Sequence, residues 1–197
     1  MNKQIKPEKF LILLCGLPGT GKTTTAKTLA QNLSQYALIE QNEVRRKHGI
    51  KRMPKTQDAV LREIDRLTAG FLNEGQGVIV ESGNRYSWRR HQMYGIASGA
   101  GKRVATLEVI CPEQLAKKRI RSRPPGDGLI DDPTDPKVYD RIKALWEDVL
   151  VDFKDPGEDH VSYVKFNTES QKLERVIVRR GMKTFITKLE RVLHKHA

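Results

Sequence analysis

Lys22 and Thr23 close a glycine-rich stretch whose residue types and spacing point to phosphate chemistry. Residues 16–23 fit the pattern G-x-x-x-x-G-K-[ST], in which backbone N–H groups surround the phosphates of a nucleotide and the lysine reaches the β- and γ-oxygens. We therefore expect Lys22 to neutralise developing charge and Thr23 to coordinate Mg²⁺. The residues predicted to bind the nucleotide are Gly16, Leu17, Pro18, Gly19, Thr20, Gly21, Lys22, Thr23 and Thr24.

A carboxylate follows the apolar run Val78-Ile79-Val80. Four small or apolar residues followed by an acid are typical of a strand whose tip holds Mg²⁺, directly or through water, beside a phosphate loop. The sequence therefore predicts Glu81 as the second metal-binding residue, together with Thr23.

Arginines are concentrated in a third stretch, before the loop Pro124-Pro125-Gly126-Asp127-Gly128. Arg119 and Arg123 are four residues apart and would share one face of a helix, from which guanidinium groups could clamp phosphate oxygens. We predict a lid over about residues 112–136. The alternative is a basic helix that only faces solvent.

Apolar runs alternate with amphipathic stretches along the chain, the pattern of a parallel sheet with helices on both faces. The sequence predicts a three-layer α/β/α P-loop NTPase fold with a mainly parallel five-stranded sheet and a helical lid, formed as one domain by residues 1–197. Strands are expected at 10–15, 36–39, 78–80, 102–110 and 161–166, and helices at 22–34, after Thr56, at 88–100, after Pro112, at 137–153 and, strongly basic, at about 169–195. Leu173, Ile177, Phe185, Leu189 and Leu193 would form the apolar stripe of the last helix, which Thr168 and Gln171 would cap.

Composition limits the classes of protein that the chain can represent. With 197 residues of which 38% are hydrophobic, it can bury one proper core, and no apolar run approaches the ~20 residues of a membrane span. The first residues lack the apolar region of a signal peptide, and Cys15 and Cys111 indicate buried thiols in a reducing compartment, so we expect a cytoplasmic protein without membrane contact.

The net charge of +12 is unevenly distributed. Eight cationic and two acidic residues between Lys172 and Lys195 supply half of the excess. Such a surface could attract nucleic acid, an acidic protein or an anionic substrate, or it could simply be a solvated helix face, since no aromatic residue besides Phe185 of the apolar stripe is interleaved there for base stacking.

These stretches, with Asn42-Glu43-Val44-Arg45 after the second strand, resemble the P-loop kinases that include the polynucleotide 5′-hydroxyl kinases. The resemblance covers most of residues 10–153 and implies ATP as donor, Mg²⁺ as cofactor and a hydroxyl-bearing acceptor. An anionic acceptor would fit the arginines of these stretches and the net charge of +12. The resemblance also implies that the position of Asn42 carries the catalytic base, usually an Asp, and that Arg45 contacts the acceptor.

Asn42 departs from that family pattern, because an amide cannot take a proton from the attacking hydroxyl. Either Glu40 or Glu43 has assumed the role, or the enzyme relies on positioning alone, or turnover is weak or absent. Glu40 is the first choice, because it would project to the same side as Asn42 if the strand extended that far. Arg85 and Arg89 could also face the acceptor.

The sequence therefore predicts an ATP-dependent, Mg²⁺-requiring phosphotransferase. Its expected catalytic residues are Lys22, Glu40, Asn42, Arg45, Arg119 and Arg123. Its acceptor could be a nucleic-acid 5′-end, a nucleotide or a small metabolite. The rival interpretation is an ATP-binding regulatory or nucleic-acid-associated protein with little or no turnover, favoured by Asn42 and the basic C-terminal stretch.

Overall fold

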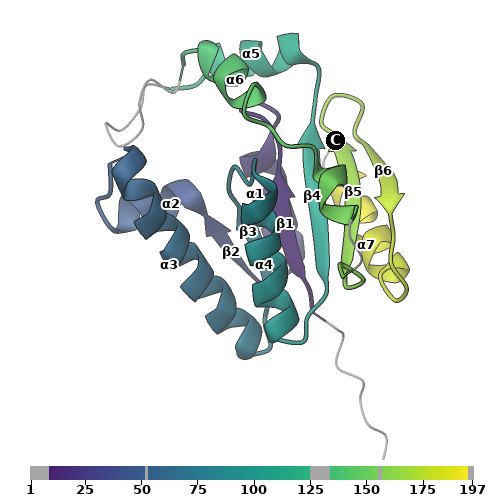
Figure 1. The fold of residues 1–197 in the computed structure, drawn as a ribbon. Coiled ribbons are helices and arrows are strands. Elements are labelled where there is room, and N and C mark those ends of the chain that lie inside the picture. Colours follow the sequence, from purple (N-terminus) through teal and green to yellow (C-terminus); the bar gives the residue numbers. More distant parts are fainter. Residues whose placement is uncertain (1–8, 52, 125–133, 155–156, 195–197) are drawn as a thin grey trace, which may run out of the picture.

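The computed structural model describes residues 9–51, 53–124, 134–154 and 157–194 and has an α/β architecture (Figure 1). Its strands are β1 (Leu11–Cys15), β2 (Tyr36–Glu40), β3 (Gly77–Glu81), β4 (Val104–Ile110), β5 (Val161–Asn167) and β6 (Lys172–Ile177). They form one sheet in the order β2-β3-β1-β4-β5-β6. All neighbouring strands are parallel except β5 and β6, which are antiparallel. The predicted fold class is confirmed, with six strands in place of the expected five.

The sheet is covered on both faces by helices, which are α1 (Lys22–Asn32), α2 (Gln41–Lys47), α3 (Pro54–Asn73), α4 (Ser87–Gly99) and α7 (Lys183–His194). Successive side chains of a strand point to opposite faces, so the fully buried β1 feeds two cores. Ile12 and Leu14 belong to the core that includes α1 and α7, whereas Leu11 and Leu13 belong to the core that includes α3 and α4. An apolar side chain at every position of β1 is what a central parallel strand requires.

Two short helices lie above the carboxyl edge of the sheet, α5 (Glu113–Arg121) and α6 (Lys137–Lys143) (Figure 1). Ala116 and Ile120 of α5 form a small buried cluster with Tyr139 of α6, and Leu17 from the phosphate loop packs against it. The apolar contact joins the lid helices to the loop that they cover. The predicted lid also includes residues 125–133, which lie outside the described residues.

Two sequence-based boundaries are wrong. The helix expected over 137–153 is divided into α6 and a 3₁₀ turn at Val149–Phe153, whose Leu150 N–H is capped by Asp148. The helix expected over about 169–195 begins only at Lys183, because residues 172–177 form β6.

Residues 168–171 make a turn between β5 and β6 instead of a helix cap. The side-chain oxygen of Asn167 accepts hydrogen bonds from the N–H groups of Glu169 and Ser170, and Gln171 adopts a left-handed φ of 56°. Gly181, at φ 84°, later redirects the chain into α7. Within the described part of the chain, no helix is long and apolar enough to cross a membrane.

Candidate active site at the carboxyl edge of the sheet

The loop between β1 and α1 has the geometry of a phosphate cradle. Gly21 precedes α1 in a left-handed conformation (φ 100°), and no side chain caps the helix. The N–H groups of the first turn therefore have no side-chain acceptor at the cap and, with the helix dipole, can attract an anion. Thr23 and Thr24 in that turn are exposed.

Gly19 shows how tightly the cradle is built. A Cβ on this residue would lie 2.3 Å from the carbonyl oxygen of Ala116 in α5, and its φ is 78°. A Cβ on Gly16 would likewise lie 2.3 Å from the carbonyl oxygen of Val109. The absence of side chains here keeps the backbone accessible and allows the lid helix to approach, which fits a nucleotide phosphate chain.

Lys22 reaches back over the loop, and its Nζ donates to the carbonyl oxygen of Leu17 at 2.9 Å. Burial lowers the pKa of Lys22, while the nearby Glu81 carboxylate raises this pKa and the Arg123 guanidinium lowers it further. The pKa of the predicted lysine therefore responds to the predicted metal-binding carboxylate and to one arginine of the predicted lid.

Glu40 and Glu81 form a pair of carboxylates at the ends of neighbouring strands. Their Cα positions are direct partners in the β2–β3 register, and Lys27 Nζ lies 3.7 Å from a Glu40 carboxylate oxygen. Burial raises the pKa of Glu40 and the negative charge of Glu81 raises it further, whereas Lys27 lowers it. A carboxyl with a raised pKa is a better proton acceptor near neutral pH. The exposed Thr23 hydroxyl and the Glu81 carboxylate offer the hard oxygen ligands that Mg²⁺ prefers.

The other acceptor-side candidates occupy α2. The expectation that Glu40 and Asn42 project from one extended strand is wrong, because β2 ends at Glu40 and Asn42 is an exposed residue of the helix that follows. Glu43 is also exposed and pairs with Arg46 at 2.5 Å. Arg45 is 1% exposed and donates a hydrogen bond to the side-chain oxygen of Gln57, so it fastens α2 to α3.

Arg89, which the sequence analysis placed on the acceptor side, is engaged within the protein. It is 3% exposed, and its Nη1 lies 2.6 Å from an Asp65 carboxylate oxygen. Arg85 remains half-buried at the end of the loop that follows β3, with its guanidinium over the ring of Tyr86.

Arg119 is held in place by Thr168, a contact that the sequence analysis did not predict. Its Nη1 donates to the Thr168 hydroxyl at 2.7 Å, and that hydroxyl donates to the carbonyl oxygen of Thr20 in the phosphate loop at 2.8 Å. Thr168 stands at the end of β5, so it links the lid helix, the sheet and the loop. No local pattern signals this role, because the contact spans 148 residues.

A buried ion pair, also missed, supports the turn after β3. Arg90 is 0% exposed, and its Nε and Nη2 lie 2.6 and 2.8 Å from the carboxylate oxygens of Asp152. The same guanidinium donates to four backbone carbonyl oxygens, those of Asn84, Arg85, Glu147 and Asp148. Arg90 thereby ties the start of α4 to the 3₁₀ turn, through Asp152, and to the two residues before that turn, through their carbonyl oxygens.

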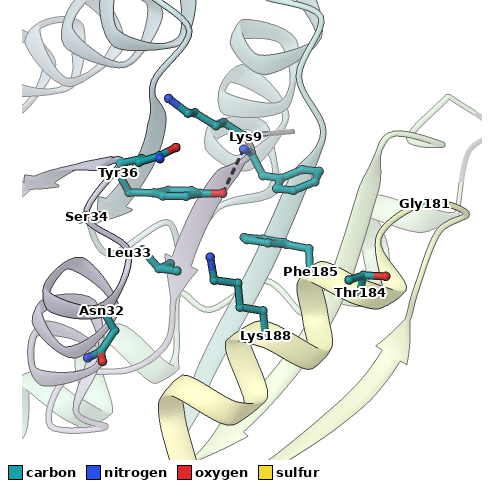
Figure 2. A pocket seen from close by; sticks show the side chains of 11 residues that line it. Lys9, Asn32, Leu33, Ser34, Tyr36, Gly181, Thr184, Phe185 and Lys188 are labelled. Atoms are coloured by element: carbon teal, nitrogen blue, oxygen red, sulfur yellow. Dashed lines mark hydrogen bonds between the residues drawn. The ribbon is translucent and has the colours of Figure 1, made fainter. Parts of the chain in front are cut away.

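A pocket of about 380 Å³ lies at the opposite, amino-terminal end of β1 and β2, beside α7 (Figure 2). Tyr36 and Phe185 form its aromatic walls, and Lys9 and Lys188 stand beside them. Its lining includes none of the residues predicted for catalysis or nucleotide binding. The candidate active site is therefore the carboxyl edge, where ligands bind in open α/β sheets.

A family model described as an AAA domain matches residues 11–145, more than half of the chain. The chain belongs to this family. The matched region contains the phosphate loop, β3 and the helix α5. The resemblance to P-loop kinases predicted from the sequence is confirmed at the level of family and fold.

Solved P-loop kinases share the fold of this AAA-domain chain at low sequence identity. A gluconokinase from Sinorhizobium meliloti 1021 is 16% identical with a TM-score of 0.56, covering 98% of this chain and 95% of that one. A proposed kinase from Chloroflexus aurantiacus J-10-fl is 18% identical with a TM-score of 0.65, covering 93% and 97% of the two chains. The APS kinase CysC of Mycobacterium tuberculosis, solved with AMPPNP and APS, is 15% identical with a TM-score of 0.51, covering 71% and 98%. Among curated proteins, none matches the sequence.

Proposed function

We propose that the protein is an ATP-dependent kinase that transfers the γ-phosphoryl group to a hydroxyl group of its acceptor. The observation that carries this proposal is the carboxylate pair Glu40 and Glu81, which stand at the ends of the neighbouring strands β2 and β3 at the edge of the sheet where the phosphate loop opens. A nucleotide-binding module without turnover has no need for a second carboxylate with a raised pKa at that place.

The backbone of residues 16–24 and the Lys22 ammonium would hold the donor phosphates. The Thr23 hydroxyl and the Glu81 carboxylate would hold Mg²⁺, which when bound neutralises charge on the phosphate oxygens. Arg123 would approach the same phosphates from the lid. Arg119 would act mainly by fixing the position of the loop through Thr168, because its guanidinium is already engaged there.

Glu40 would accept the proton of the attacking hydroxyl at its carboxylate oxygen. Its raised pKa keeps the group basic enough for this task, and Lys27 keeps it oriented. Asn42, exposed at the start of α2, would contact the acceptor by hydrogen bonding without exchanging protons.

The acceptor is expected to be anionic, because Arg123 of the lid acts on the charge of Lys22 and the chain carries a net charge of +12. The acceptors named for the structural neighbours differ from one another. They therefore do not indicate whether this protein phosphorylates a nucleotide, a nucleic-acid end or a small metabolite. The free thiols of Cys15 and Cys111 are compatible with activity in a reducing compartment such as the cytoplasm.

The test is incubation with γ-labelled ATP and Mg²⁺ in the presence of gluconate, nucleosides, nucleotides and 5′-hydroxyl oligonucleotides, with ATP binding measured in parallel. We expect transfer of label to at least one hydroxyl acceptor. Measurable ATP binding without transfer to any of them would contradict the proposal and favour an ATP-binding regulatory protein.

A further inference from the structure

The first residues of α4 and the turn before it carry an exposed aromatic surface. The rings of Tyr86 and Trp88 stack with centroids 6.2 Å apart and planes 18° apart, and the Arg85 guanidinium lies 4.6 Å from the centroid of the Tyr86 ring. Trp88 is 56% exposed, the largest exposed fraction among the large apolar side chains of the described residues. We infer that these three residues, the Arg85–Trp88 platform, stack against an unpaired nucleobase of the acceptor.

The platform lies on the edge of the sheet where the acceptor must arrive. It begins four residues after Glu81, the end of β3. Asn84, in the intervening turn, donates from its side-chain nitrogen to the carbonyl oxygen of Leu14 at 2.7 Å, which holds the turn against the end of β1. The phosphate loop starts at Gly16, directly after the end of β1 and two residues after Leu14, so one edge of the sheet carries both the donor cradle and the platform.

The turn that presents the platform is fixed before any ligand binds. The Arg90 guanidinium donates to the carbonyl oxygens of Asn84 and Arg85, and the Ser87 N–H donates to a Glu147 side-chain oxygen at 2.6 Å. The Glu147 N–H in turn donates to the carbonyl oxygen of Arg85 at 3.0 Å. A preorganised aromatic surface loses little conformational entropy when a planar ligand stacks on it.

The chemistry of the platform favours a nucleobase over other acceptors. Base–aromatic stacking with an adjacent arginine is the usual way in which proteins hold single-stranded nucleic acid, because every base presents a π-face. A sugar ring has no π-face and can offer the exposed indole only its C–H groups, so the ribose control is needed to separate the two. A second copy of this chain is the competing occupant, since Leu145 and Leu150 are also exposed in the neighbouring segment.

The binding test uses Trp88 as its own reporter. The chain has two tryptophans, so a Trp146→Phe background leaves Trp88 as the one fluorescent indole. With the donor site filled by Mg²⁺ and AMPPNP, adenosine and a short single-stranded 5′-hydroxyl oligonucleotide are titrated, and ribose serves as the base-free control. We expect saturable quenching by a nucleobase ligand and none by ribose. Quenching by adenosine would show that a single nucleoside is sufficient for binding to the platform. Quenching by the oligonucleotide but not by adenosine would show that the platform binds the end of a strand.

The kinetic test rests on the proposed kinase activity. For a nucleobase-bearing acceptor, Trp88→Ala should raise the KM about 5- to 150-fold, the range for one lost base–aromatic stack, with the KM for ATP unchanged. Trp88→Phe should recover most of the affinity, because it restores a π-face. Leu150→Ala is the matched control, since it removes exposed apolar surface from the adjoining segment without removing a ring.

Three outcomes would overturn the inference. They are quenching by ribose equal to that by the nucleobase ligands, no quenching by either nucleobase ligand, and a KM change in Trp88→Ala no larger than in Leu150→Ala. Dissociation of a dimer by Trp88→Ala, seen in sedimentation while the KM for the nucleobase-bearing acceptor stays unchanged, would identify the platform as a contact between copies. Failure of the proposed function gives a different result, namely quenching by a nucleobase with no transfer to any acceptor.

Discussion

Replacing Glu40 by Gln tests the proposed base with the least disturbance of the fold. The substitution keeps the shape of the side chain and removes its ability to take a proton. A general base contributes roughly 10²–10⁴-fold to the rate, so kcat should fall by that factor, equivalent to about 2.7–5.5 kcal/mol in the barrier. ATP affinity should be unchanged, because the donor phosphates are held by the loop and Lys22.

Stability should change little in the same variant. The ion pair that is lost joins Glu40 to Lys27, whose side chain is 54% exposed, and such pairs contribute about 0–1 kcal/mol. The loss of repulsion between Glu40 and Glu81 offsets part of that. A fall in kcat with an unchanged unfolding transition would therefore show that the substitution affects the chemical step and not the stability of the fold.

The pH profile supplies the second readout. The base works when deprotonated, and burial together with the Glu81 charge raises the pKa of Glu40, so kcat/KM of the natural protein should rise with pH through a limb above the ordinary range of a glutamate. Glu40→Gln should lack this limb, while the control Glu43→Gln, at an exposed position, should retain it. Full turnover and an intact limb in Glu40→Gln would refute the assignment. If Glu40 is the base, Asn42→Asp should leave turnover flat. If Glu40→Gln refutes that assignment, Asn42→Asp becomes the next variant to measure.

Three further predictions concern the loop and its support. Lys22→Ala should abolish transfer or weaken ATP binding measured by calorimetry, and unchanged kinetics would contradict the cradle. Gly19→Ala should destabilise the protein by more than about 1 kcal/mol in urea unfolding, because its Cβ would lie 2.3 Å from a carbonyl oxygen of α5 at positive φ. Gly70→Ala, in the last turn of α3 where a Cβ would meet nothing within 4 Å, should instead stabilise it by about 0.4–1 kcal/mol. Arg90→Met should cost about 3–5 kcal/mol, since it leaves the Asp152 charge buried without its guanidinium, and should lower Tm by roughly 6–20 °C in calorimetry. The double variant with Asp152→Leu should recover much of that loss, and no recovery would mean that the hydrogen bonds to backbone carbonyls dominate.

The parts of the site that the sequence predicted are those encoded in short, contiguous patterns. The phosphate loop joins a strand to a helix within a few residues, and Glu81 follows its strand directly, so their neighbourhood at one edge follows from parallel topology alone. Glu40 is similar, because a strand that ends at the same edge places its last side chain beside Glu81.

The failures share a different cause, which is dependence on contacts between distant segments. Leu173 and Ile177 are four residues apart and fit a helical stripe, but pairing with β5 makes them part of a strand, and this pairing leaves no mark in local periodicity. Arg89 and Arg90 are adjacent in the sequence and equally basic. Their burial is decided by Asp65 and Asp152, to which each donates a charged hydrogen bond.

Strand β6 moves the free edge of the sheet away from β5. An edge strand presents unpaired backbone groups that invite another chain to add a strand, and charged side chains are a common protection against this. Lys172, Glu174 and Arg175 are all exposed on β6, and a register irregularity interrupts the ladder behind it at Tyr163. The exposed charges of β6 therefore stand where they disfavour edge-to-edge pairing with another chain.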